Sequence, residues 1–127
     1  MRLIYIAGPF RGKNPWDVHC NVHEAEMLGL EVAKLGAYPV IPHAMTRHFD
    51  KLLTDEFWLQ GTLEMMKRCD GSITTSRWKD SNGAFEEVVV MKELFKPVFH
   101  DLASLKDYLS WGGYSERVTE QRLKDKS

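Results

Sequence analysis

The chain has 127 residues, of which 43% are hydrophobic and 28% are charged, and its formal net charge is -1. This length and this mixture fit one globular domain with a substantial core. The balanced charge argues against binding to a nucleic acid polymer, and no apolar run approaches the roughly 20 residues that a membrane span needs.

Cellular location is predicted from the N-terminus and the cysteines. The apolar run at residues 3–7 is shorter than the core of a signal peptide, so we expect it to be a strand. Cys20 and Cys69 have no metal-like spacing and are expected to remain thiols in a reducing compartment. We therefore predict a cytoplasmic protein without a membrane segment.

The first strand and helix carry clear boundary signals. Residues 3–7 are β-prone, and the run stops at Gly8-Pro9. Asn14 offers an N-cap and Pro15 a first-turn residue, and apolar positions at helical spacing continue until Gly36. The remaining elements are predicted as a strand at 38–41, a loop at 43–53, a helix from the Thr54 cap to Cys69, a strand at 71–75, a loop at 76–83, a helix at 84–95, a strand at 97–99 and a helix from the Asp101 cap to Leu109.

This alternation of strands and helices predicts the fold class. We expect an α/β domain at residues 1–111 with three layers, built on a doubly wound, mainly parallel sheet of four to five strands, like Rossmann or flavodoxin folds. Residues 112–127 form a charged tail that is expected to be a weak helix or disordered. Ligands bind beyond the carboxyl ends of such strands, where segments 8–13 and 76–83 and the region near His43 should meet.

Glu87 is the most informative residue of the sequence. At about 100° per residue, it projects into the apolar arc of the helix predicted at 84–95, whereas Glu86 lies with Glu93 on the solvent side. A buried carboxylate persists when it is paired or functional. Placed in the first helical turn, Glu87 should be held ionised by free N–H groups, as a nucleophile requires. The alternative is a glutamate that caps the turn or pairs with an arginine.

Two loops near this helix suit a ligand. In 80–83, the backbone N–H groups at Gly83 and Ala84 can hold a phosphate or a sugar oxygen, although Ser81 or Asn82 can also act as a simple N-cap. Segment 8–13 is bounded by glycines and contains Arg11, which could bind one phosphate in a bidentate manner. The spacing differs from that of a Walker loop, and a turn with solvated charges is the alternative.

Two segments together resemble a known family. Tyr5-Ile6-Ala7-Gly8-Pro9, Asp70 and the run Ser81-Asn82-Gly83-Ala84-Phe85-Glu86-Glu87 are similar to the nucleoside 2-deoxyribosyltransferase-like superfamily over residues 3–99. This superfamily includes deoxyribosyltransferases and 2'-deoxynucleoside 5'-monophosphate N-glycosidases. Its nucleophilic glutamate matches Glu87, the residue that the helical-face argument selects independently.

The resemblance implies roles for further residues. Ser81 would contact the sugar or its 5'-phosphate, Arg11 would bind phosphate in a Gly-x-x-Arg-Gly loop, and Tyr5 would line the pocket. Phe10 or Trp78 would stack on the base, and Asp70 would belong to the catalytic set. The resulting site is expected to contain catalytic Glu87 and Asp70, with Tyr5, Gly8, Phe10, Arg11, His43, Trp78, Ser81 and Gly83 binding the substrate.

Two positions depart from the family pattern. Val89 stands where the family usually has glycine, and Thr62 stands where many members have an acid. A proton for the leaving base would then come from Asp55, Asp70 or His43, or would be missing.

The expected function is cleavage or transfer at the N-glycosidic bond of a nucleoside or nucleoside 5'-monophosphate through a covalent glycosyl-glutamate, without cofactor or metal. The first alternative is a non-catalytic nucleotide-binding or sensor module on the same fold. The second is a metal site at His19 and His23, which are spaced i, i+4 but lack an evident acidic third ligand. We also expect a homodimer or a larger homo-oligomer, because the family forms oligomers with shared active sites.

Overall fold

The computed structural model describes residues 1–49 and 51–112, so all of the predicted tail except Gly112 lies outside the described residues. The sheet has four parallel strands, β1 (Leu3–Ala7), β2 (Tyr38–Val40), β3 (Gly71–Thr74) and β4 (Val98–Phe99), in the order β2-β1-β3-β4. The predicted α/β class with a parallel sheet is confirmed.

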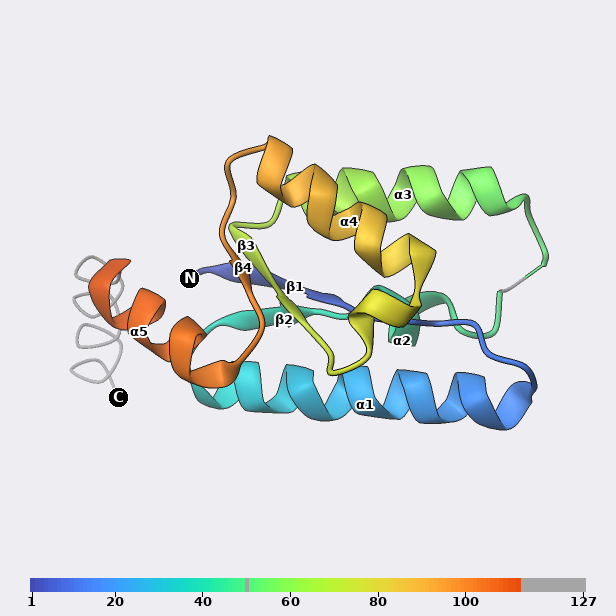
Figure 1. Cartoon of the computed structure of the whole chain (residues 1–127), viewed down its shortest axis with the longest axis horizontal. Helices are drawn as coiled ribbons and strands as arrows, with labels where there is room; N and C mark the ends of the chain where they lie inside the picture. The colour runs from blue at the N-terminus through green and yellow to red at the C-terminus, as the bar shows by residue number, and fades with distance from the viewer. Residues whose placement is uncertain (50, 113–127) are drawn as a thin grey trace, which may run out of the picture.

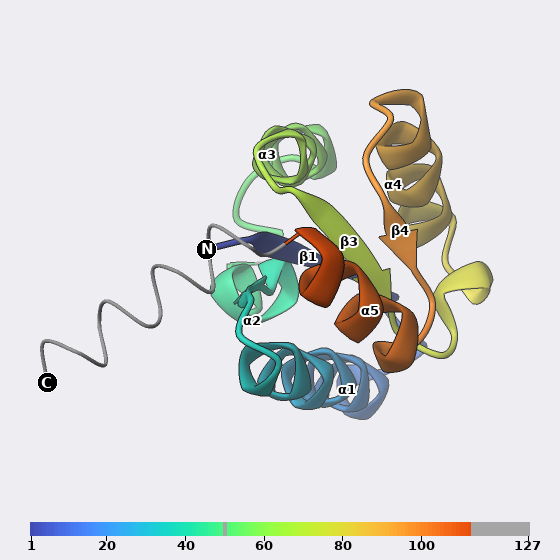
Figure 2. The same cartoon turned by 90° about the vertical axis from the view of Figure 1, so that its left-hand side faces the viewer.

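Helices cover both faces of this sheet. Figures 1 and 2 show α3 and α4 on one face and α1 and α5 on the other, which gives three layers. No helix in the described part of the chain combines the length and apolar character needed to cross a membrane. The helical elements are α1 (Pro15–Lys34), α2 (Pro42–Thr46), α3 (Asp55–Lys67), the 3-10 turn η1 (Trp78–Asp80), α4 (Asn82–Glu93) and α5 (Leu102–Gly112).

Strand β1 is the centre of the core and sends alternate side chains to the two faces. Ile4 and Ile6 pack in the cluster that includes residues of α1 and α5, whereas Tyr5 and Ala7 pack with residues of α3 and α4. All four side chains are at most 1% exposed. Tyr5 is therefore fixed on the face that also carries α4.

The helix starts follow the local signals in the sequence. Asn14 accepts a hydrogen bond from the backbone N–H of Asp17 (2.9 Å), and Thr54 accepts one from Phe57 (3.2 Å), as N-caps do. These contacts confirm the predicted starts of α1 and α3.

Three local predictions are wrong. Segment 43–53, predicted as a loop, contains the short helix α2, which begins at Pro42. Helix α4 starts two residues before the expected position, because the Ser81 hydroxyl accepts from Ala84 N–H and caps it. Phe95, the last residue of the helix predicted at 84–95, instead follows α4 with φ 57° and is 96% exposed, where the chain turns towards β4.

The strand order creates a switch point between β1 and β3. From β1 the chain crosses to β2 on one side, and from β2 it returns to β3 on the other side of β1. In open parallel sheets, such a point leaves a crevice beyond the carboxyl ends of the two strands. The loops after β1 and β3 border this crevice.

Candidate functional site

A cavity of about 680 Å³ lies at this switch point. Its volume is within the usual range for small-molecule sites, roughly 300–1,000 Å³. The wall is built from four parts of the chain, namely Tyr5, Gly8, Pro9, Phe10 and Arg11; Pro42, His43 and Thr46; Asp55, Glu56, Trp58, Leu59 and Thr62; and Asp80, Ser81, Asn82, Gly83, Ala84 and Glu87.

Glu87 lies in the wall of this cavity and is 8% exposed, whereas its neighbour Glu86 is exposed. The predicted inward orientation is confirmed. Its predicted place in the first turn is wrong, because α4 starts at Asn82 and Glu87 falls in the second turn, away from the free N–H groups. Burial raises the pKa of Glu87 to about 7, against a smaller lowering by the Tyr5 hydroxyl.

Tyr5 is the side chain whose hydroxyl interacts with the Glu87 carboxyl group. It is fully buried, and its pKa is raised well above 10 by burial first and then by the Glu87 charge. Within the described part of the chain, neither Tyr5 Oη nor Glu87 Oε2 has a hydrogen-bond partner. Two buried polar atoms of a cavity wall are thus left for each other or for a ligand, because unpaired buried groups cost free energy.

His43 fixes the rim on the α2 side. It is 7% exposed, and its Nε2 lies 2.7 Å from the carbonyl oxygen of Gly8. Because a carbonyl oxygen only accepts, Nε2 carries the proton and donates it. Burial lowers the pKa of His43, so the ring is neutral at pH 7 and its Nδ1 has a free lone pair.

Asn21 of α1 holds the loop after β1 through hydrogen bonds. Asn21 Nδ2 donates to the backbone oxygens of Phe10 (3.1 Å) and Arg11 (3.3 Å), and its Oδ1 accepts from Arg77 Nη2 (2.8 Å). Asn21 therefore joins α1 to the loops after β1 and β3. Asn21 is not among the residues predicted for the site, although a polar residue beside Val22 on an apolar helix face was a usable signal.

Gly8 is required by close packing at the end of β1. A Cβ on this residue would lie 2.3 Å from Thr75 Oγ1 and 2.8 Å from Thr75 Cγ2. The glycine lets the strand end approach the residue that follows β3. This approach holds the loop after β1 against the carboxyl end of β3.

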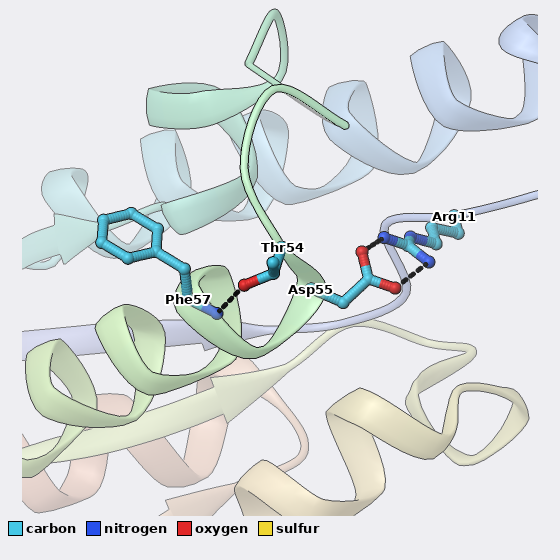
Figure 3. A network of polar contacts seen from close by, with 4 residues as sticks. All are labelled: Arg11, Thr54, Asp55 and Phe57. Carbon is cyan, nitrogen blue, oxygen red and sulfur yellow. Dashed lines mark hydrogen bonds and ion pairs between the residues drawn. The ribbon is translucent and has the colours of Figure 1, made fainter.

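Arg11 and Asp55 form a bidentate ion pair at the rim (Figure 3). Nη2 lies 2.5 Å from Oδ1 and Nη1 lies 3.3 Å from Oδ2, joining the loop after β1 to the first turn of α3. The Arg11 guanidinium lowers the pKa of the Asp55 carboxyl group. Both side chains are more than half exposed, so the pair contributes little to stability but holds Asp55 ionised.

The structure brings most of the predicted site together. Besides Glu87, the cavity wall contains seven of the eight predicted substrate-binding residues, namely Tyr5, Gly8, Phe10, Arg11, His43, Ser81 and Gly83. Their roles stay predictions, but their common location is a property of the fold.

Asp70 and Trp78 are placed elsewhere, and both predictions are corrected. Asp70 precedes β3, at the opposite end of the strand from the cavity, and its carboxylate accepts from the Leu3 N–H at 2.7 Å. Trp78 stacks between Phe85 and His100, with centroid distances of 5.8 and 4.9 Å, and is not part of the cavity wall.

Several wall residues were not expected at the site. Trp58, within the helix predicted from Thr54 to Cys69, lines the cavity, and its Nε1 is buried without a partner in the described residues. Glu56 and Asp80 add two exposed carboxylates to the wall. For Glu56, the available signal was the acidic pair Asp55-Glu56 at the start of a predicted helix.

The predicted alternative at His19 and His23 gives a stacked pair of exposed rings. Their centroids are 6.3 Å apart with an interplanar angle of 14°, and Trp16 stacks on His19. Within residues 1–49 and 51–112, no group of three or more His, Cys, Asp or Glu side chains is arranged to hold a metal ion.

A family model matches most of the chain. No curated protein matches the sequence significantly. The model of a family described as a domain of unknown function (DUF4406) matches residues 2–100, which include all four strands and every residue of the cavity wall. The chain therefore belongs to the DUF4406 family.

Proposed function

We propose that this protein cleaves or transfers at the N-glycosidic bond of a nucleoside or nucleoside 5'-monophosphate, with Glu87 as the nucleophile. The observation that carries the proposal is the buried Glu87 carboxyl in the wall of a cavity of about 680 Å³. The motif that ends at Glu87 and its resemblance to the deoxyribosyltransferase-like superfamily support the same chemistry.

The reaction would take place in two displacements at the anomeric carbon. In the first, an oxygen of ionised Glu87 bonds to this carbon, and the electron pair of the C–N bond leaves with the base. In the second, a water molecule or another base bonds to the carbon, and the Glu87 ester bond breaks. Water gives the free sugar and loses one proton, which the released carboxylate can accept.

The remaining wall residues supply binding and orientation. Tyr5 Oη can donate a hydrogen bond to the Glu87 carboxylate, because its raised pKa keeps the phenol protonated. The amino end of α4, with the backbone of Gly83 and the hydroxyl of Ser81, offers polar groups to the sugar. Phe10 contributes an aromatic surface for the base.

Chromatography of nucleosides and nucleoside 5'-monophosphates after incubation with the protein tests this proposal. We expect a free base to appear with the wild-type chain and with Glu86→Gln, an exposed matched control, but not with Glu87→Gln. Base release by Glu87→Gln at the wild-type rate would remove Glu87 from the mechanism.

A non-catalytic nucleotide-binding module is the second candidate. It is favoured by Thr62, which lines the cavity at the position where many members of the resembled superfamily have an acid. The Thr62 hydroxyl donates a hydrogen bond to the Leu59 carbonyl oxygen (3.0 Å). Such a module would bind nucleotides in a calorimetric titration and release no base. The same incubation therefore separates the two candidates.

A further inference from the structure

The cavity wall has an acidic charge balance. Among the described residues, it includes four carboxyl groups, from Asp55, Glu56, Asp80 and Glu87, and one guanidinium, that of Arg11, which is bound to Asp55. The N-terminus of α4 adds about half of a positive charge, which is smaller than the excess of carboxylates. A cationic ligand is therefore favoured by this wall over an anionic one.

The groups that could protonate a departing base are engaged in other ways. His43 is neutral and directs its one ring proton at Gly8 O. Asp55 is held as a carboxylate by Arg11. Thr62, an alcohol, donates to a backbone oxygen.

Tyr5 keeps its proton as well, because burial raises the pKa of the phenol well above 10. Among the described wall residues, these side chains do not supply a ready acid at neutral pH. Without a proton from one of these side chains, a neutral base would leave as an anion, whereas a base that is already cationic leaves as a neutral molecule.

We propose that the substrate of this site is a nucleoside with a cationic base, such as a pyridinium nucleoside or an N7-alkylated purine nucleoside. This inference rests on the proposed function of Glu87. The acidic wall selects the positive charge, and Phe10 and Trp58 place two aromatic rings in this wall, a residue type that stabilises a cationic ring.

When the base is a cation, the first displacement needs no proton donor. Glu87 bonds to the anomeric carbon, the C–N electron pair moves to the ring nitrogen, and the positive charge of the base is cancelled. The cation also stabilises the ionised form of Glu87 before attack. The same charge thus helps both binding and formation of the nucleophile.

Guanosine and N7-methylguanosine are a matched pair of probes, because they differ by one methyl group and one positive charge. The readout is the enzymatic rate of base release divided by the spontaneous rate of the same nucleoside, in mildly acidic buffer. We expect this ratio to be at least about 100-fold larger for N7-methylguanosine than for guanosine. General acid catalysis contributes at least about this factor, and guanosine would have to react without it. Equal ratios would show that the preformed charge of the base gives no advantage in this site; they would overturn this inference and leave the proposed function intact.

Binding to Glu87→Gln tests the charge selection without turnover. Adding Asp55→Asn and Glu56→Gln should weaken binding of N7-methylguanosine at least threefold and leave guanosine unchanged. Glu64→Gln is the control, since Glu64 is exposed on the same helix, pairs with Lys67 and lies outside the wall. Equal weakening of both ligands, or of neither, would overturn the selection by charge.

Failure of the proposed function and failure of the cationic-substrate inference give different results in these incubations. If the wild-type chain cleaves neither nucleoside, Glu87 is not a nucleophile towards this class and the inference falls with it. Cleavage of guanosine alone would overturn only the cationic substrate. The two failures are thus distinguishable in one set of incubations.

Discussion

The imidazole of His43 and the carbonyl oxygen of Gly8 are 2.7 Å apart, which ties the short helix α2 to the end of the central strand β1. Both residues are buried, so the bond forms away from water. The segment that follows Gly8 contributes Phe10 and Arg11 to the cavity wall. Together with the hydrogen bonds from Asn21, this contact positions one side of the site.

Two substitutions of His43 should behave differently. Gln can place its amide nitrogen where Nε2 lies and keep the bond to Gly8 O, whereas Asn reaches only the position of Nδ1. We expect His43→Asn to lower the free energy of unfolding by about 1–3 kcal/mol, the usual cost of a buried unpaired acceptor. His43→Gln should be less destabilising, and urea unfolding measures both. Equal losses would mean that the bond to Gly8 is not what the histidine contributes.

Gly8→Ala should destabilise the chain through a clash with Thr75. The new Cβ would meet Thr75 Oγ1 at 2.3 Å, and relief requires movement of β1 or β3. Overpacking of this kind costs typically about 1–3 kcal/mol. Thr75→Ala in the same chain should recover part of the loss, which a double-mutant cycle by thermal or urea unfolding can measure. Absence of coupling between the two positions would contradict this packing.

Glu87→Gln should reduce kcat by at least about 1,000-fold while changing ligand affinity little, because the amide keeps the shape but cannot act as the nucleophile. Single-turnover base release and calorimetric binding measure the two parts separately. Glu86→Gln, one position away and exposed, should be close to wild type. Similar losses in both variants would indicate a general effect on α4.

The pH profile of activity should follow the ionisation of Glu87. Because its pKa is raised to about 7, kcat/KM should rise about tenfold per pH unit below 7 and level off above it. A pyridinium nucleoside is the suitable substrate, since its charge is independent of pH. A profile that is flat between pH 5 and pH 8 would show that ionised Glu87 is not required.

Burial of Glu87 should also make stability depend on pH. The folded pKa of about 7 lies above the ordinary value of 4.5, so the folded state keeps a proton that the unfolded state loses between these values. The free energy of unfolding should fall by about 3 kcal/mol as pH rises through this window, and stay level above it. Urea unfolding of wild type and Glu87→Gln at acidic and neutral pH measures this difference. Parallel pH dependence in the two proteins would exclude Glu87 as its source.

The sequence by itself was sufficient for features that depend on neighbours along the chain. Asn14 and Thr54 mark helix starts because a capping side chain reaches only two or three residues ahead. The inward direction of Glu87 followed from about 100° of rotation per residue. Alternation of strands and helices was enough for the parallel α/β class, because it leaves few other layer arrangements.

Tertiary structure decided what depends on residues far apart in sequence. Arg11 and Asp55 are 44 positions apart, and no local rule pairs them. Trp78 lies outside the cavity wall and stacks with Phe85 and His100, two residues that no local rule places beside it. The pKa of Glu87 depends on how much water the packed core excludes around the carboxyl, which only the complete fold sets.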